Sequence, residues 1–321
     1  MMQPIGAPDG RKRPRYVGPD TFARLPRLVD VDRAGVAILG VPFDAGVSYR
    51  PGARFGPAAI RAGSKLLRPY HAPLEVEPWY VHQVADAGDL APNPFDIAEA
   101  IAQIEAGAAT TLEHADRLLV LGGDHTIALP LLRVAKRDRG PIALIHFDAH
   151  LDTWNTYFGA GYTHGTPFRR AFEEGLLASE RSVHVGIRGS LYGTADLADD
   201  AGFGFEIVST ADVATTSVES AVERIRRRVA DSPVYISIDI DVLDPAHAPG
   251  TGTPEPGGLS SREAMLILRG LAGLPIAGVD IVEVAPPYDH AELTALAAAN
   301  LAYECLALFA LSPGAGSKVG G

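Results

Sequence analysis

From about residue 34 onward, the chain alternates short runs rich in β-branched residues with longer stretches rich in alanine and leucine. This alternation predicts strands and helices that follow one another, which is typical of a three-layer α/β/α domain with a mainly parallel central sheet. Nearly continuous apolar runs, such as the one from Ile142 to Ile145, indicate strands that are covered on both faces. In sheets of this class, ligands bind at the carboxyl ends of the strands. Functional residues are therefore expected at those ends.

The expected strands occupy residues 35–41, 117–121, 142–147, 182–187, 205–208, 234–241 and 276–282, and the expected helices occupy residues 57–67, 95–114, 127–137, 166–177, 217–230, 262–271 and 292–311. Two helices are preceded by a capping-box pattern, formed by Thr216 with Glu219 and by Ser260 with Glu263. Because no repeat, low-complexity block or long linker interrupts the alternation, we expect a single domain over residues 21–313. Residues 1–20 and 314–321 are expected to be flexible tails.

The composition argues against several classes of protein. Lys plus Arg number 28 and Asp plus Glu number 39, and the net charge of -11 repels phosphate backbones, so no nucleic-acid partner is expected. The basic run from Arg11 to Arg15 is typical of a solvated tail. The single cysteine, Cys305, excludes an internal disulfide and a cysteine-built zinc site and suits a reducing cytoplasm. We find no secretory signal and no apolar stretch near the ~20 residues of a membrane span, so no membrane partner is expected.

Histidine and aspartate are concentrated at the ends of four predicted strands. The segments are Gly122-Gly123-Asp124-His125, residues 146–152 (His-Phe-Asp-Ala-His-Leu-Asp), residues 237–241 (Ser-Ile-Asp-Ile-Asp) and residues 280–283 (Asp-Ile-Val-Glu). Side chains alternate along extended backbone, so Asp148, His150 and Asp152 are expected on one side, and Asp239 and Asp241 likewise share a side. Each motif alone is more often a turn or a solvated edge. On successive strands of one sheet, they indicate a common site.

The apolar setting of these acids predicts a metal site. An unpaired carboxylate in a dry interior costs several kcal/mol, and a cluster of like charges costs more. Two divalent cations would cancel the formal charge of Asp148, Asp152, Asp239 and Asp241, with His125 and His150 as neutral ligands. Oxygen and imidazole ligands without thiolate favour Mn²⁺ over Zn²⁺ or Mg²⁺. The remaining histidines are expected to be structural, except for His164, whose motif is considered below: His71, His82, His114, His146, His184, His247 and His290.

These motifs resemble those of the ureohydrolase family, the arginases and agmatinases, which hydrolyse guanidino compounds to urea. The likeness is carried by Gly122–His125, by Asp148–Asp152, by residues 237–245 with the following 248–254 (Ala-Pro-Gly-Thr-Gly-Thr-Pro), and by Glu283. Residues 48–57 (Ser-Tyr-Arg-Pro-Gly-Ala-Arg-Phe-Gly-Pro) are similar to an N-terminal loop motif of the family. The resemblance spans the chain from about residue 40 to its end and implies an arginase-like fold.

The resemblance also implies a role for each site residue. His125, Asp148, Asp152 and Asp239 would hold one manganese ion and Asp148, His150, Asp239 and Asp241 the other, so that Asp148 and Asp239 bridge. A metal-bridging hydroxide would attack the guanidinium carbon, which Glu283 positions. Asp152 would pass on the hydroxide proton, and His164, in the motif Thr163-His164-Gly165-Thr166, would be the proton shuttle; read alone, His164 is more typical of a capping or core histidine. Family members are commonly trimers or hexamers, which implies a homo-oligomer.

The substrate is indicated by the loop at residues 153–163, which is aromatic rather than rich in Asn and Ser as in arginase. This resembles the agmatinase branch and favours agmatine, which is cleaved to putrescine and urea. A guanidino acid such as 4-guanidinobutyrate is the alternative, because Arg50, Arg169 or Arg170 would suit a carboxylate. Trp154 and Tyr157 are candidates for substrate contacts or for loop packing. Two further alternatives are a histone-deacetylase-like amidohydrolase, whose tandem histidine pair this chain lacks, and a non-catalytic homologue.

Overall fold

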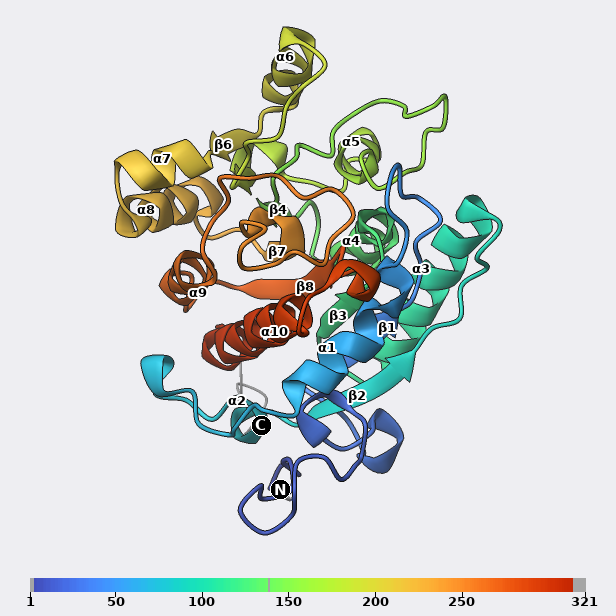
Figure 1. Ribbon diagram of the computed structural model, residues 1–321, viewed down its shortest axis with the longest axis vertical. Coiled ribbons are helices and arrows are strands. Elements are labelled where there is room, and N and C mark those ends of the chain that lie inside the picture. Colours follow the sequence, from blue (N-terminus) through green and yellow to red (C-terminus); the bar gives the residue numbers. More distant parts are fainter. Residues whose placement is uncertain (1–2, 138, 314–321) are drawn as a thin grey trace.

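The computed structural model describes residues 3–137 and 139–313 (Figure 1). Eight parallel strands form one sheet in the order β2-β1-β3-β8-β7-β4-β5-β6. Their bounds are β1 Val36–Val41, β2 Val84–Asp89, β3 Leu118–Gly122, β4 Ala143–Phe147, β5 Val183–Val185, β6 Glu206–Val208, β7 Val234–Asp239 and β8 Ile276–Val282. Every residue of β1, β3, β4, β7 and β8 is buried, as expected for parallel strands covered on both faces.

Helices cover both faces of the sheet. Their bounds are α1 Gly56–Ser64, α2 Pro78–Val81, α3 Ile97–Glu113, α4 Ala128–Lys136, α5 Pro167–Glu173, α6 Thr194–Phe203, α7 Thr210–Thr215, α8 Val218–Val229, α9 Ser261–Gly270 and α10 Leu293–Leu311. One core cluster joins the sheet to α1, α8, α9 and α10, and a second joins it to α3, α4 and α5. In Figure 1, α10 lies in front of the sheet beside α1. The predicted three-layer α/β/α fold is thereby confirmed.

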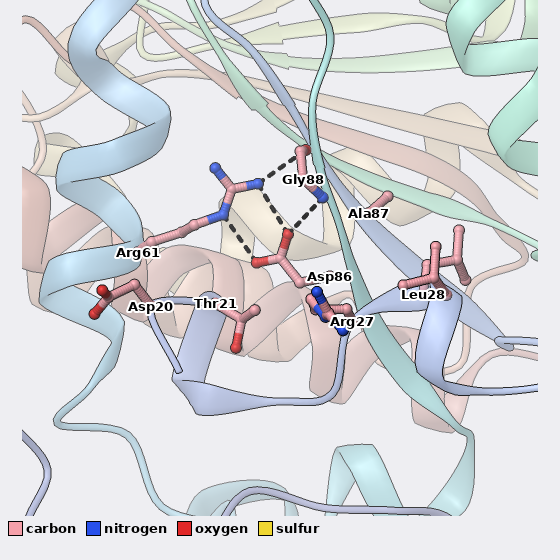
Figure 2. A pocket seen from close by; sticks show the side chains of 9 residues that line it. Asp20, Thr21, Arg27, Leu28, Arg61, Asp86, Ala87 and Gly88 are labelled. Carbon is pink, nitrogen blue, oxygen red and sulfur yellow. Dashed lines mark hydrogen bonds and ion pairs between the residues drawn. The ribbon is translucent and has the colours of Figure 1, made fainter. Parts of the chain in front are cut away.

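Strand β2 was absent from the expected elements, because its sequence carries Asp86, Gly88 and Asp89 and reads as a loop. It is an edge strand, and its polarity has a partner: the Arg61 guanidinium donates to both carboxylate oxygens of Asp86, at 2.8 and 3.0 Å. Figure 2 shows this pair in a surface cavity of about 280 Å³. A contact between residues this far apart in the chain has no local sequence pattern.

One expected detail of the helices is wrong. The capping box at Thr216 and Glu219 does not form: Ser217 accepts from the Ser220 N–H at the start of α8, whereas the Thr216 hydroxyl donates to the Asp212 carbonyl at the end of α7. The short helices α2, α6 and α7 were also missed. The capping box of Ser260 and Glu263 is confirmed, with reciprocal hydrogen bonds of 3.2 and 2.8 Å at the start of α9.

The expectation that no apolar stretch approaches the length of a membrane span is wrong for helix α10. Its 19 residues are long and apolar enough to cross a membrane by composition, but 78% of the apolar window is buried inside the fold, which is typical of a core helix.

Of the two expected tails, the structure describes residues 3–20 at the N-terminal end but not residues 314–321 at the C-terminal end. Residues 3–20 contact the fold, since the Arg24 guanidinium donates to the Pro8 carbonyl at 2.7 Å and the Ile5 N–H donates to Gln83 Oε1 at 2.8 Å. The flexibility of this segment and the domain bounds 21–313 stay predictions. Residues 314–321 lie outside the described residues.

Candidate metal centre

The candidate site lies at the carboxyl ends of four adjacent central strands, β3, β8, β7 and β4. His125 follows β3 in the short 3-10 turn 125–127, and residues 148–152 follow β4. Asp239 ends β7, Asp241 lies in the 3-10 turn 240–242, and Glu283 follows β8. The structure therefore brings all six predicted ligands together. The expected reason was incomplete, because Asp152 (φ 53°) and Asp241 leave the extended strand, and turns rather than alternation aim their side chains.

The ligands form two clusters that share Asp148. In the first, His125 Nδ1 lies 2.9 Å from Asp152 Oδ2, 3.3 Å from Asp148 Oδ2 and 3.5 Å from Asp239 Oδ2. In the second, His150 Nδ1 lies 3.2 Å from both Asp148 Oδ1 and Asp241 Oδ2. The two oxygens of Asp148 thus face different clusters, which is the arrangement of a bridging carboxylate. Asp239 is near the first cluster, and its predicted bridge to the second stays a prediction.

The hydrogen bonds of His125 show that the first cluster fits a cation. Ser237 Oγ donates to Asp280 Oδ1 at 2.6 Å, so it accepts from His125 Nε2–H at 2.8 Å. Because Nε2 donates, Nδ1 is the ring nitrogen that faces the three carboxylate oxygens, and this buried nitrogen has no hydrogen-bond partner among the described residues. A lone pair facing anionic oxygens is repulsive unless a proton or a metal ion lies between them. Oxygen and imidazole donors suit Mn²⁺, so these residues fit the predicted ions.

The charges of the cluster act in the same sense. Burial and then the charges of Asp241 and Asp148 raise the pKa of Asp239 well above its usual value. Burial and the charge of Asp148 raise the pKa of Asp241 to about 6. Burial alone would raise the pKa of Asp148 as well, but the imidazoles of His146, His125 and His150 hold it well below its usual value. Positive charge stabilises this group of acids, and divalent ions would supply it.

His146 lies close to His125, Asp148 and Asp152, although a structural role was expected for it. Its Nε2 lies 2.8 Å from Asp148 Oδ2 and its Nδ1 lies 2.7 Å from His184 Nδ1. Because hydrogen bonds use both ring nitrogens, His146 has no lone pair left for a metal ion. It contacts the metal ligand Asp148 rather than acting as a ligand itself.

Glu283 and His164 form a contact pair beside the first cluster. Glu283 Oε1 accepts from the His125 N–H at 2.9 Å and from His164 Nδ1–H at 3.1 Å, whereas Oε2 faces Gly252. The Ser48 N–H donates to His164 Nε2 at 3.1 Å, and the Ser48 hydroxyl lies 2.8 Å from the same nitrogen. Burial disfavours a second proton on this ring, but the Glu283 carboxylate outweighs it and raises the pKa of His164 to about 9. His164 can therefore exchange a proton at Nε2 while Nδ1–H stays on Glu283. Ser48 was not predicted as a partner of His164, although it lies in the loop motif at residues 48–57.

The residues predicted to contact the substrate differ in the partners that they have. The Trp154 and Tyr157 rings are 5.8 Å apart, and the hydroxyls of Tyr157 and Tyr192 are 2.6 Å apart. Two of the candidate arginines are already paired, since Arg169 and Arg170 both contact Glu173 at 3.0 to 3.1 Å. Arg50 instead lies over the rings of Tyr49 and Tyr288 and has no ion-pair partner within residues 3–137 and 139–313.

A family model described as the Arginase family matches residues 34–308. The chain belongs to the arginase family. Guanidinobutyrase of Pseudomonas aeruginosa is 45% identical over 95% of this chain and 96% of its own length, and the mitochondrial agmatinase of Gallus gallus is 43% identical over 91% and 86%. The solved structure of proclavaminate amidino hydrolase from Streptomyces clavuligerus has a TM-score of 0.89 at 40% identity and covers 93% of this chain and 99% of that chain.

This arginase-family protein is a hydrolase of guanidino carbon–nitrogen bonds, and the predicted family and enzyme class are confirmed. Membership decides against the histone-deacetylase-like alternative. Members of the family depend on a binuclear metal centre, usually of manganese. Relatives of nearly equal identity are named for different guanidino substrates, so identity alone does not select the substrate.

Proposed function

We propose that this protein is an agmatinase that hydrolyses agmatine to putrescine and urea with two Mn²⁺ ions per subunit. The observation that carries the proposal is the pair of buried clusters that share Asp148, in which His125 and His150 each direct Nδ1 at carboxylate oxygens. A solved relative, the formiminoglutamase of Trypanosoma cruzi, is described with Mn²⁺ at 26% identity and a TM-score of 0.79.

The ligand assignment follows the resemblance. His125, Asp148, Asp152 and Asp239 would hold one ion, and Asp148, His150, Asp239 and Asp241 the other. Two such ions would lower the pKa of a shared water molecule toward neutrality and so supply the nucleophile.

The protein's own residues orient the substrate and move protons. Glu283 is held by the His125 N–H and by His164 through Oε1, which leaves Oε2 to accept charge-assisted hydrogen bonds from the guanidinium. The leaving amine must be protonated before it departs. Asp152 accepts the proton of the attacking water, and His164 carries a proton at Nε2 between the site and solvent.

Agmatine is favoured over a guanidino acid by a carboxylate at the rim of the second cluster. Glu255 Oε1 lies 3.7 Å from His150 Nε2, and its side chain is 30% exposed, so it would attract the distal ammonium of agmatine. The aromatic rings of Trp154 and Tyr157 suit an apolar four-carbon chain.

The second candidate, a guanidino-acid hydrolase, is favoured by Arg50. This arginine lacks an ion-pair partner within the described part of the chain. Its carbonyl oxygen and Oε2 of Glu283 both lie near Gly252, at 3.1 and 3.7 Å from the position that a Cβ on Gly252 would take. A substrate carboxylate would meet its guanidinium.

Urea release from agmatine, 4-guanidinobutyrate and arginine, measured side by side, tests the two candidates. We expect agmatine to give the highest kcat/KM, and Glu255→Gln to raise its KM about tenfold while leaving 4-guanidinobutyrate unchanged. If the guanidino acid is the substrate, Arg50→Met should raise the KM for 4-guanidinobutyrate and leave the KM for agmatine unchanged. A preference for 4-guanidinobutyrate that Arg50→Met abolishes would refute the agmatine assignment. Absence of urea from every guanidino compound, with two Mn²⁺ ions bound, would refute the catalytic proposal.

Glu283→Gln tests the substrate contact separately. The amide must keep Oε1 toward the two donors, so its Nε2–H groups would face the donors of the guanidinium, and kcat/KM should fall about 100-fold or more. Manganese content should not change, because Glu283 is not a proposed ligand. Glu292→Gln, the same change at an exposed residue, is the control.

The assembly and the compartment are also proposals. We infer a homo-oligomer, a trimer or a hexamer, because family members commonly assemble in this way. We infer a cytoplasmic location because the only cysteine, Cys305, is buried and free. Light scattering of the purified chain would test the subunit count, and a monomer would refute it.

A further inference from the structure

A chain of buried polar groups leads from Asp148 away from the two metal clusters. His146, on β4, places Nε2 at 2.8 Å from Asp148 Oδ2 and Nδ1 at 2.7 Å from Nδ1 of His184 on the neighbouring strand β5. His184 Nε2 in turn lies 3.2 Å from Oδ1 of Asp200 on α6. All four side chains are shielded from solvent. We call these groups, Asp148, His146, His184 and Asp200, the Asp148–Asp200 relay.

The relay returns to the metal site by a second route. The Thr153 hydroxyl donates to Asp200 Oδ1 at 3.1 Å, and Thr153 follows the proposed ligand Asp152 directly in the chain. Asp200 is therefore connected to two metal ligands, through two imidazoles to Asp148 and through one hydroxyl to the backbone next to Asp152.

The hydrogen bonds of the relay fix where its protons lie. Because the Asp148 carboxylate only accepts, it places a proton on Nε2 of His146, and an imidazole with one proton keeps a lone pair on Nδ1. Nδ1 of His146 must then accept from Nδ1–H of His184. The third contact is a close approach of His184 Nε2 to Asp200 Oδ1 at 3.2 Å, and this ring nitrogen has no hydrogen-bond partner among the described residues. Asp200 contacts the side of the His184 ring that is turned away from His146, and it therefore restricts the rotation of this ring and keeps its Nδ1–H directed at His146.

The position of Asp200 in the fold is unusual for an aspartate. It is the only buried residue of α6, and its Oδ2 has no hydrogen-bond partner among the described residues. An apolar side chain would satisfy helix packing here without burying a carboxylate. The contact with His184 therefore explains why a carboxylate is buried at this position.

We propose that His146, His184 and Asp200 are positioning residues that hold the Asp148 carboxylate so that each oxygen faces one metal cluster. Asp148 Oδ1 is fixed by the His150 N–H at 2.6 Å, and the relay fixes Oδ2. Partners of this kind orient ligands, and their loss commonly weakens metal binding about 10- to 100-fold. This inference rests on the proposed metal centre.

Titration of the metal-free protein with Mn²⁺, with free Mn²⁺ measured by electron paramagnetic resonance, tests the relay. Asp200→Ala removes the carboxylate that contacts His184 Nε2 and should raise the Mn²⁺ dissociation constant about tenfold. Asp200→Asn should stay within about threefold of wild type, because its amide N–H can donate to His184 Nε2 and preserve the Nδ1–H to His146. Asp199→Ala is the matched control, since this neighbouring aspartate is 58% exposed, pairs with Arg169 and should leave the constant unchanged.

The outcomes separate the relay from the proposed function. Wild-type Mn²⁺ affinity in Asp200→Ala would overturn the relay and leave the metal centre intact. Failure of wild-type protein to bind two Mn²⁺ ions would overturn the metal centre instead. If Asp200→Ala does not fold, Asp200→Val, which fills the space without a polar atom, takes its place with the same expected weakening, and unchanged affinity there would equally overturn the relay.

Discussion

The close approach of Gly123 to Phe43 predicts that a single methyl group removes the first metal cluster. Gly123 follows β3 and directly precedes Asp124 and His125. A Cβ at this position would lie 1.8 Å from the Phe43 carbonyl oxygen and 2.7 Å from its backbone N and C atoms. Carbon and oxygen atoms that are not bonded do not approach closer than about 3 Å, so the two segments would have to separate by about 1.2 Å.

This separation would break the hydrogen bonds that join the two segments. The Gly123 N–H donates to the Val41 carbonyl at 2.9 Å and the Asp124 N–H donates to the Phe43 carbonyl at 2.7 Å. Both distances would exceed a hydrogen bond after the shift, which costs about 2–6 kcal/mol of unfolding free energy for two buried groups. His125 would move with this backbone, whereas metal ligands tolerate displacements of only about 0.2 Å.

We therefore expect Gly123→Ala to lose at least half of its manganese, to release urea about 100-fold more slowly and to melt several degrees lower. Elemental analysis of the purified protein and thermal denaturation measure these effects. Gly202→Ala on α6 is the control, because a Cβ there meets nothing within 4 Å. Two Mn²⁺ ions per chain and an unchanged melting temperature in Gly123→Ala would refute the steric argument.

Three further predictions follow from charge and burial. Burial and the charge of Asp148 raise the pKa of Asp241 to about 6, so the metal-free protein should gain stability as the pH falls through 6, whereas the manganese-loaded protein should lose stability. Denaturant melts with and without chelator measure both effects. The same pH dependence in the two samples would contradict the assignment of Asp241 as a metal ligand. The pKa of His164, about 9, predicts that this residue contributes about 3 kcal/mol of stability to the metal-free protein below pH 6.5, and that this contribution is lost as the pH rises through 9. His164→Gln should remove this pH dependence. A variant with the pH profile of the wild type would contradict the prediction. Arg188 donates to six backbone carbonyls around Asp241 and Glu255, so Arg188→Met should cost about 3–5 kcal/mol by denaturant melt, and a loss below 1 kcal/mol would contradict it.

The residues predictable from sequence are those whose local pattern matches their environment. The five central strands are buried throughout and mostly apolar, and the ligands occur in short dense motifs at or just beyond the strand ends, so both could be predicted from sequence. Strand β2 and helix α6 were not, because Asp86 and Asp200 look like surface residues. Their burial depends on Arg61, 25 positions away from Asp86, and on His184, 16 positions away from Asp200, through contacts that local periodicity does not encode.

The same reasoning explains the errors at the ligands themselves. Alternation along a strand predicted that Asp148, His150 and Asp152 share a side, yet the strand ends at Phe147 and Asp152 has a left-handed backbone. His146 was taken as structural because its two partners, Asp148 Oδ2 and His184, are defined by the pairing of β4 with β5 and by the side-chain rotamers. Motif composition therefore identified the ligands, whereas the tertiary structure determined how they are aimed.

Two residues of the site have a strained backbone. Asp152 and Glu283 have φ values of 53° and 63°, which cost about 1–3 kcal/mol each in residues other than glycine. Both flank the first cluster, where buried carboxylates already repel one another. The strands that precede them are buried throughout and contain no residue of this kind, so we expect the sheet to remain folded without the metal. Removing the metal should therefore leave a folded protein whose loops 148–152 and 283–288 exchange their amide hydrogens faster, whereas β4, β7 and β8 remain protected.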